Sequence, residues 1–135
     1  MLCACSEPVV EQSTVGSAVN ANNNQQLKPE QRSAHALGIV VTSIPERPPI
    51  NDYFKLDIRL NAPKYAEIKA KAIRVEAIMP THQHGMNVEP IIKPHLIAQR
   101  FTAEGLIFHM RGDWLVYIYI NLPDGTEKIT LPVTI

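Results

Sequence analysis

The sequence predicts an all-β protein, an immunoglobulin-like β-sandwich of about seven strands that follows a disordered N-terminal tether. From Leu37 onward, short runs alternate apolar and polar residues with period two, as half-buried strands do. The 11 prolines and six glycines lie mostly between short apolar runs, which suits strands and turns better than helices. A length of 135 residues with 45% apolar and 19% charged residues allows one compact domain of ordinary globular composition.

Seven segments have the alternation, or the β-branched and aromatic content, that is typical of strands. The clearest is the run from Phe54 to Leu60, which places every second side chain on one apolar face. Turn residues separate the segments, and we expect turns at Glu104-Gly105 and, as the best hairpin signal, at Pro123-Asp124-Gly125. The predicted strands are residues 37–44, 54–60, 70–79, 96–101, 106–110, 114–122 and 128–135.

Two sheets built from these strands would enclose Trp114 as a large core residue close to Phe108 and Leu56. The strand that starts at Trp114 is apolar on both faces, so we expect its second face to be covered by the tether, by Tyr117 and Tyr119, or by a partner. An open meander or a barrel is the alternative architecture.

Both cysteines lie in the first five residues, within the sequence Leu2-Cys3-Ala4-Cys5. This tetrad resembles the lipobox of bacterial lipoproteins, and the resemblance implies that Cys5 becomes the lipidated N-terminus. Residues 1–5 are then the remnant of a lipoprotein signal, and the protein is a periplasmic lipoprotein, on the outer membrane rather than the inner one. The alternatives are an unprocessed protein with two surface thiols and a Cys-x-Cys metal arm.

Residues 6–36 have the composition of a flexible polar linker. The run Asn20-Ala21-Asn22-Asn23-Asn24-Gln25-Gln26 is low in complexity, and such a segment buries too little apolar surface to offset the entropy lost on ordering. The folded domain is therefore predicted to cover residues 37–135.

Charge and motifs exclude several classes of function. The chain has 13 basic and 13 acidic residues, whereas nucleic-acid-binding proteins present a basic face. No stretch of 18 apolar residues is present, so we expect no membrane span. Nucleophile motifs and glycine-rich phosphate loops are also missing from the sequence, and we expect no enzymatic activity.

Methionine and histidine are concentrated in one part of the chain. The chain has four methionines and five histidines, and seven of these nine residues fall between residues 79 and 110. Thioether sulfur favours cuprous copper and imidazole serves copper and zinc, so this mixture predicts a copper site without cysteine. His109 is an alternative ligand from the neighbouring strand. The candidate ligands are Met79, His82, His84, Met86 and Met110.

The same region resembles a known family. Met79-Pro80 followed by His82-x-His84-Gly85-Met86, and then Phe108-x-Met110-x-Gly112-x-Trp114, is similar to the YtkA-like domain and to FixH-type proteins. The resemblance implies a small envelope sandwich associated with copper handling or oxidase maturation. It also implies that the five candidate ligands carry over, and that Gly112 and Trp114 are structural.

Two functions of different classes follow from the sequence. The first is a lipid-anchored periplasmic β-sandwich that binds Cu(I) reversibly, as a carrier or accessory factor for a copper-receiving protein. The second is a structural or adaptor lipoprotein that binds no metal and docks on a larger envelope complex through a sheet edge or through the face of Tyr117 and Tyr119.

Overall fold

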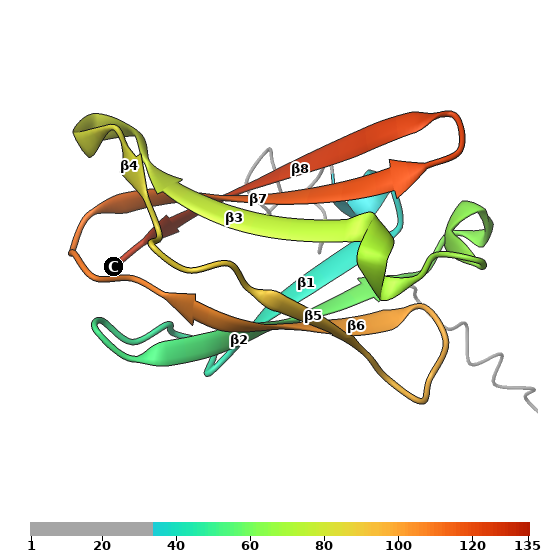
Figure 1. The fold of residues 1–135 in the computed structure, drawn as a ribbon, viewed down its shortest axis with the longest axis horizontal. Helices are drawn as coiled ribbons and strands as arrows, with labels where there is room; N and C mark the ends of the chain where they lie inside the picture. The colour runs from blue at the N-terminus through green and yellow to red at the C-terminus, as the bar shows by residue number, and fades with distance from the viewer. Residues whose placement is uncertain (1–33) are drawn as a thin grey trace, which may run out of the picture.

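The computed structural model describes residues 34–135, which form two antiparallel sheets packed face to face (Figure 1). Cys5, residues 1–5 and all of the predicted linker except residues 34–36 lie outside the described part. Ala34 is only 4% exposed and packs on the core, so side-chain packing extends three residues beyond the predicted domain boundary at Leu37. No helix among residues 34–135 is long and apolar enough to cross a membrane.

Sheet 1 has the strand order β1-β2-β6-β5, and sheet 2 has the order β4-β3-β7-β8. The strands of sheet 1 are β1 (Ile39–Ile44), β2 (Tyr53–Leu60), β5 (Ile91–Pro94) and β6 (Arg100–Ile107). The strands of sheet 2 are β3 (Ile73–Met79), β4 (His84–Gly85), β7 (Asp113–Leu122) and β8 (Gly125–Thr134). Short 3-10 helices occur at η2 (Pro63–Tyr65), η3 (Ala70–Ala72) and η4 (Pro80–His82).

This strand order is that of an immunoglobulin sandwich. With β1, β2, β5 and β6 as strands A, B, D and E, and β3, β7 and β8 as C, F and G, the two sheets are A-B-E-D and C-F-G. The two-residue strand β4 adds a short C′ strand beside β3. The predicted immunoglobulin-like β-sandwich is confirmed, and residues 34–135 contain eight strands where about seven were predicted.

Four local predictions were wrong. The predicted strand 70–79 starts three residues late, because residues 70–72 form the 3-10 helix η3 and β3 begins at Ile73. Residues 96–99 form a loop and β6 starts at Arg100, because β5 comes earlier in the chain, at Ile91. The predicted strand 106–110 is only the end of β6, which finishes at Ile107. Glu104-Gly105 is not a turn, because Gly105, with φ of +89°, is the extra residue of a β-bulge opposite Phe54 and Lys55.

The predicted hairpin is confirmed at Pro123-Asp124, where Leu122 pairs with Gly125 across the turn. The core lies between the sheets and contains the inward side chains that the period-two pattern selects, such as Leu56, Ile58 and Leu60 of β2. Trp114 is fully buried there, and its ring centroid lies 4.8 Å from that of Phe108, as the sequence predicted.

The sandwich has two ends with different contents (Figure 1). One end carries the β3–β4 and β6–β7 connections and the C-terminus, and we call it the histidine end. The other carries the start of the described chain, the β5–β6 loop and the β7–β8 hairpin, and we call it the N-terminal end.

Candidate functional site

The predicted Met/His loop lies at the histidine end, where it leaves strand β3 and returns as β4. Pro80 starts the 3-10 turn η4, where its fixed φ fits and its missing N–H is not needed. Gln83 then adopts a left-handed conformation with φ of +54°, which reverses the chain. His84 pairs with Met79 and Gly85 pairs with Ile78, so the loop is a tight hairpin with a fixed register.

Three imidazole rings gather at this end. The ring centroids of His84 and His109 are 5.1 Å apart, and those of His82 and His84 are 5.8 Å apart. Two imidazoles that bind one ion through nitrogen at about 2.0 Å have centroids about 5 Å apart. The centroid spacing of the His84–His109 pair is therefore compatible with two ligands of one metal ion, and it is equally the spacing of two rings in direct contact.

Trp114 forms the floor under this pair. Its ring centroid lies 5.3 Å from that of His109 and 6.3 Å from that of His84, both in edge-on arrangements. The indole N–H of Trp114 donates a 3.0 Å hydrogen bond to the backbone carbonyl of Met110, which ties the β6–β7 connection to β7. Half-buried imidazoles over a fully buried indole give a site that is apolar below and open to solvent above.

Two candidate sulfurs share a face with His84. Met86 follows His84 by two residues and continues the register opposite Ala77, to which its N–H donates a 3.0 Å hydrogen bond. Met79 and His84 are direct partners across the β3–β4 ladder, and such partners point to the same side of a sheet with Cβ atoms about 5 Å apart. Met79 is only 1% exposed, and its methyl group lies 2.5 Å from the position that a Cβ atom on Gly112 would occupy. Its thioether is thus a buried group on the strand position directly opposite His84.

The other candidates are placed differently. Met86 is half-buried and packs against the core, and Met110 is 36% exposed on the β6–β7 connection. His82 is exposed at the outer edge of the cluster. The sequence offered His109 only as an alternative ligand. In the structure its ring is the nearest imidazole to that of His84.

His82, His84 and His109 are not arranged as a three-ligand site, and within the described residues no carboxylate completes one. Among residues 34–135, no group of three or more His, Cys, Asp or Glu side chains is arranged to hold a metal ion. A site here would therefore use the imidazole pair with a thioether.

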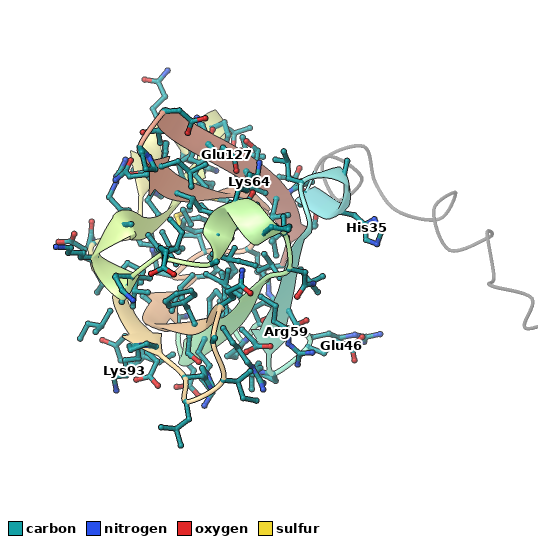
Figure 2. All side chains as sticks on the ribbon, turned by 90° about the vertical axis from the view of Figure 1, so that its right-hand side faces the viewer. His35, Glu46, Arg59, Lys64, Lys93 and Glu127 are labelled. Carbon is teal, nitrogen blue, oxygen red and sulfur yellow. The ribbon has the colours of Figure 1, made fainter. Side chains whose placement is uncertain are left out.

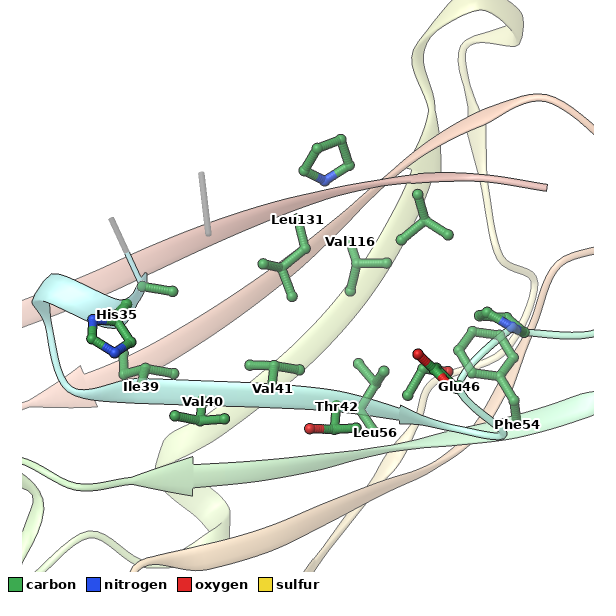
Figure 3. Close-up of a pocket in the computed structure, with 15 residues that line it drawn as sticks. His35, Ile39, Val40, Val41, Thr42, Glu46, Phe54, Leu56, Val116 and Leu131 are labelled. Atoms are coloured by element: carbon green, nitrogen blue, oxygen red, sulfur yellow. The ribbon is translucent and has the colours of Figure 1, made fainter. Parts of the chain in front are cut away.

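A second feature is a groove of about 390 Å³ between the edge strands β1 and β8 (Figure 3). Its walls are mainly apolar, with Ile39 and Val41 on one side and Leu131 and Val133 on the other. His35 and Glu46 lie near its two ends. None of the residues that line this groove belongs to the histidine cluster, so the groove is separate from the histidine end.

The outer face of sheet 2 carries the two tyrosines that the sequence offered as a docking face. Arg74 lies 4.2 Å from the ring centroid of Tyr119, and Lys128 lies 3.8 Å from that of Tyr117. The Tyr119 hydroxyl donates a 2.7 Å hydrogen bond to Glu76, and this bond raises the pKa of Tyr119. Both rings are half-buried under these charged side chains, which cover the second face of β7.

No family model matches this chain, and comparison with curated proteins and with solved structures gives no match either. The geometry described above is therefore the basis for a functional proposal.

Proposed function

We propose that this β-sandwich is a copper-binding carrier or accessory protein and that its metal site lies at the histidine end. The observation that supports the proposal most directly is the His84–His109 pair, whose ring centroids are 5.1 Å apart above Trp114. Met79 adds a thioether on the face to which His84 points.

This donor set suits Cu(I) better than a hard cation. Imidazole nitrogen and thioether sulfur are neutral ligands of intermediate and soft character, and Mg²⁺ or Ca²⁺ would require oxygen ligands. Two imidazoles at the surface and one buried sulfur would leave one side of the ion open. An open site of this kind favours exchange with a copper-receiving protein, which is the role that we propose in place of catalysis.

The cellular setting of the proposal comes from the sequence. The lipobox-like tetrad that ends at Cys5 would anchor the protein in the periplasm, on the outer membrane rather than the inner one. The resemblance to YtkA-like and FixH-type domains agrees with copper handling and with the sandwich fold. The lipid anchor and the family resemblance are both parts of the proposal.

Titration with Cu(I) under reducing conditions tests the site. A chromophoric cuprous chelator competes with the full-length chain, and we expect one equivalent of copper to be retained. His84→Ala or His109→Ala should weaken retention at least about 10-fold, since each removes one of two nitrogen ligands. Met79→Leu keeps the packing volume but removes the sulfur, so it separates the role of Met79 as ligand from its role in the core.

The matched control is His95→Ala. His95 lies on the separate β5–β6 segment, where its ring nitrogen is 2.5 Å from the Thr102 hydroxyl. If His95→Ala weakens copper retention as much as His84→Ala does, binding is non-specific and the proposed site is wrong. Unchanged retention in both His84→Ala and His109→Ala would also reject it.

A second candidate function, that of an adaptor subunit without metal, is favoured by sheet 1. Its outer face exposes apolar side chains on three strands, including Tyr53 at 63% and Ile91 at 64%. This face replaces the tyrosine face of sheet 2 as the better docking surface. A photo-crosslinker at Ile91 should then give a discrete crosslinked species in intact envelopes, and the same probe at Thr130 of β8 should not.

A further inference from the structure

The β5–β6 loop at the N-terminal end presents two consecutive apolar side chains to solvent. Leu96 is fully exposed, at 108% of the reference area, and Ile97 is 64% exposed. Leu96 is the most exposed of the large apolar side chains in residues 34–135. Exposed neighbours of this kind at a loop tip indicate a surface that something apolar covers.

The exposure is built into a well-anchored loop. The His95 N–H donates to the Arg100 carbonyl at 2.9 Å and closes the base of the loop. The Gln99 carbonyl accepts a 2.8 Å hydrogen bond from the Leu60 N–H, and its side-chain amide donates to the Ala62 carbonyl at 3.1 Å. The loop is thus fixed to the end of β2 with its apolar tip directed outward.

Basic side chains lie beside this tip. The Nε atoms of Arg59 and Arg100 each donate to one oxygen of the buried Asp57, at 2.9 Å and 2.7 Å. Two guanidinium groups on one carboxylate leave a net positive charge, and both arginines line a surface hollow of about 140 Å³ together with Ile97. Figure 2 looks onto this end, where Arg59 lies on the side that the loop occupies. Lys93 lies on the same side but is paired with Glu104, so it adds no net charge.

The start of the described chain lies at the same end of the sandwich. The Asn61 N–H, next to the loop, donates a 2.7 Å hydrogen bond to the carbonyl of Gly38, four residues after Ala34. Residues 1–33, with the candidate lipid site at Cys5, therefore join the domain at the end that carries the loop (Figure 1).

We propose that the N-terminal end faces an anionic lipid bilayer. Leu96 and Ile97 enter the interface between headgroups and acyl chains, while Arg59 and Arg100 contact the headgroup phosphates. The bilayer fits because it supplies both an apolar layer for the loop tip and negative charge for the arginines. The histidine end then points away from the membrane. This proposal does not depend on copper binding.

Vesicle sedimentation with the unlipidated full-length chain tests the proposal. The vesicles are phosphatidylcholine alone, or phosphatidylcholine with phosphatidylglycerol as the minor component. We expect binding to the anionic vesicles that weakens with added salt, and at least about 10-fold weaker binding to the neutral ones. In the double variant Leu96→Ser with Ile97→Ser, we expect the partition coefficient on anionic vesicles to fall at least about 10-fold.

Two matched controls isolate the surface. Ile91 has the same exposed fraction as Ile97 but lies at the start of β5, so Ile91→Ser should bind as the parent does. Arg59→Gln should weaken binding to anionic vesicles, whereas Arg111→Gln at the histidine end should not. Ile91, Leu96, Ile97 and Arg111 are exposed, so their variants should keep the free energy of unfolding of the parent in urea. Arg59→Gln removes one of the two guanidinium groups on Asp57 and should lower this free energy, so its vesicle binding is compared with the parent where urea unfolding shows both to be folded.

Several results would overturn the proposal. They are no binding to either vesicle, equal binding to both vesicles, and equal binding by the parent and the Leu96 and Ile97 double variant. Inorganic phosphate that binds the arginines without any vesicle binding would assign the hollow to a free anion. Self-association that the double variant abolishes, without lipid binding, would assign the loop to a second copy of the chain.

Discussion

Gly112 connects the stability of the fold with the candidate metal site, and its replacement by alanine gives a sharp test. Gly112 has a φ of +133°, which side-chain-bearing residues rarely adopt. A Cβ atom there would lie 2.5 Å from the methyl group of Met79, which is too close for van der Waals contact. Gly112→Ala therefore has two separate costs, one in the backbone and one in packing.

The structure allows each cost to be estimated. A residue held in a conformation reserved for glycine costs about 1–3 kcal/mol. Displacing a buried side chain to admit one more methyl group costs about 1–3 kcal/mol. The expected loss in the free energy of unfolding for Gly112→Ala is therefore about 2–6 kcal/mol. Gly125 also has a strongly positive φ, of +147°, but its added Cβ would meet nothing within 4 Å. Gly125→Ala should therefore show the backbone cost alone.

Urea unfolding followed by the fluorescence of Trp114, the single tryptophan, measures these free energies. Met79→Ala removes the obstructing methyl group at its own cost of about 2–5 kcal/mol. In the double variant Gly112→Ala with Met79→Ala, the packing cost should disappear. Its loss in the free energy of unfolding should therefore be smaller than the sum of the losses of the two single variants by about 1–3 kcal/mol. Strict additivity, or equal losses for Gly112→Ala and Gly125→Ala, would show that the contact with Met79 is not the cause.

Three further outcomes are expected. Tyr65 is buried, and burial together with its 2.5 Å hydrogen bond to Glu127 raises its pKa to about 12. Stability should therefore fall as pH rises from 10 toward 12, because the unfolded phenol ionises first. Tyr65→Phe should reduce this fall in alkaline urea titrations and leave the smaller part that comes from the raised pKa of Tyr119. Burial raises the pKa of Asp57, but the hydrogen bonds and charges of Arg100 and Arg59 outweigh this effect and hold the pKa below its usual value. The stabilisation of the fold by ionised Asp57 is therefore fully present above pH 3.8 and is lost as pH falls through the lowered pKa. Asp57→Asn should cost about 3–5 kcal/mol at pH 7 in urea unfolding and should flatten this acid-side loss, and a cost below about 1 kcal/mol would contradict the ion-pair account. Intact mass of the membrane-extracted protein should show a chain that starts at Cys5 with the added mass of lipid, and an unmodified N-terminus would reject the anchor.

Local pattern was sufficient for most strands. The alternation in 54–60 predicted β2 and its inward face, and the Pro123-Asp124-Gly125 signal predicted the β7–β8 hairpin. It failed between residues 91 and 107, where the partner strands, not the local sequence, decide which residues pair. Glycine is typical of turns, yet Gly105 lies inside β6 as a bulge because β6 pairs with β2 on one side and with β5 on the other.

The candidate site was predicted in part. The sequence placed His82 and His84 in a short loop after a strand, and the hairpin of β3 and β4 agrees with this. It did not single out His109, which is 25 residues from His84 in the chain and approaches it only because β3 and β7 are neighbours in sheet 2. It also did not distinguish the methionines, since burial of Met79 and exposure of Met110 depend on which side of the finished sheet each one occupies.

Sequence by itself determined the class of fold, because the alternation of apolar residues along each strand defines a buried face wherever that strand is placed. It also determined which part of the chain is rich in soft ligands. Only the tertiary structure decided the order of strands and the side chains that meet at each end of the sandwich. Pairing between strands brings together residues far apart in the chain, and their proximity is a property of the register, which no local pattern contains.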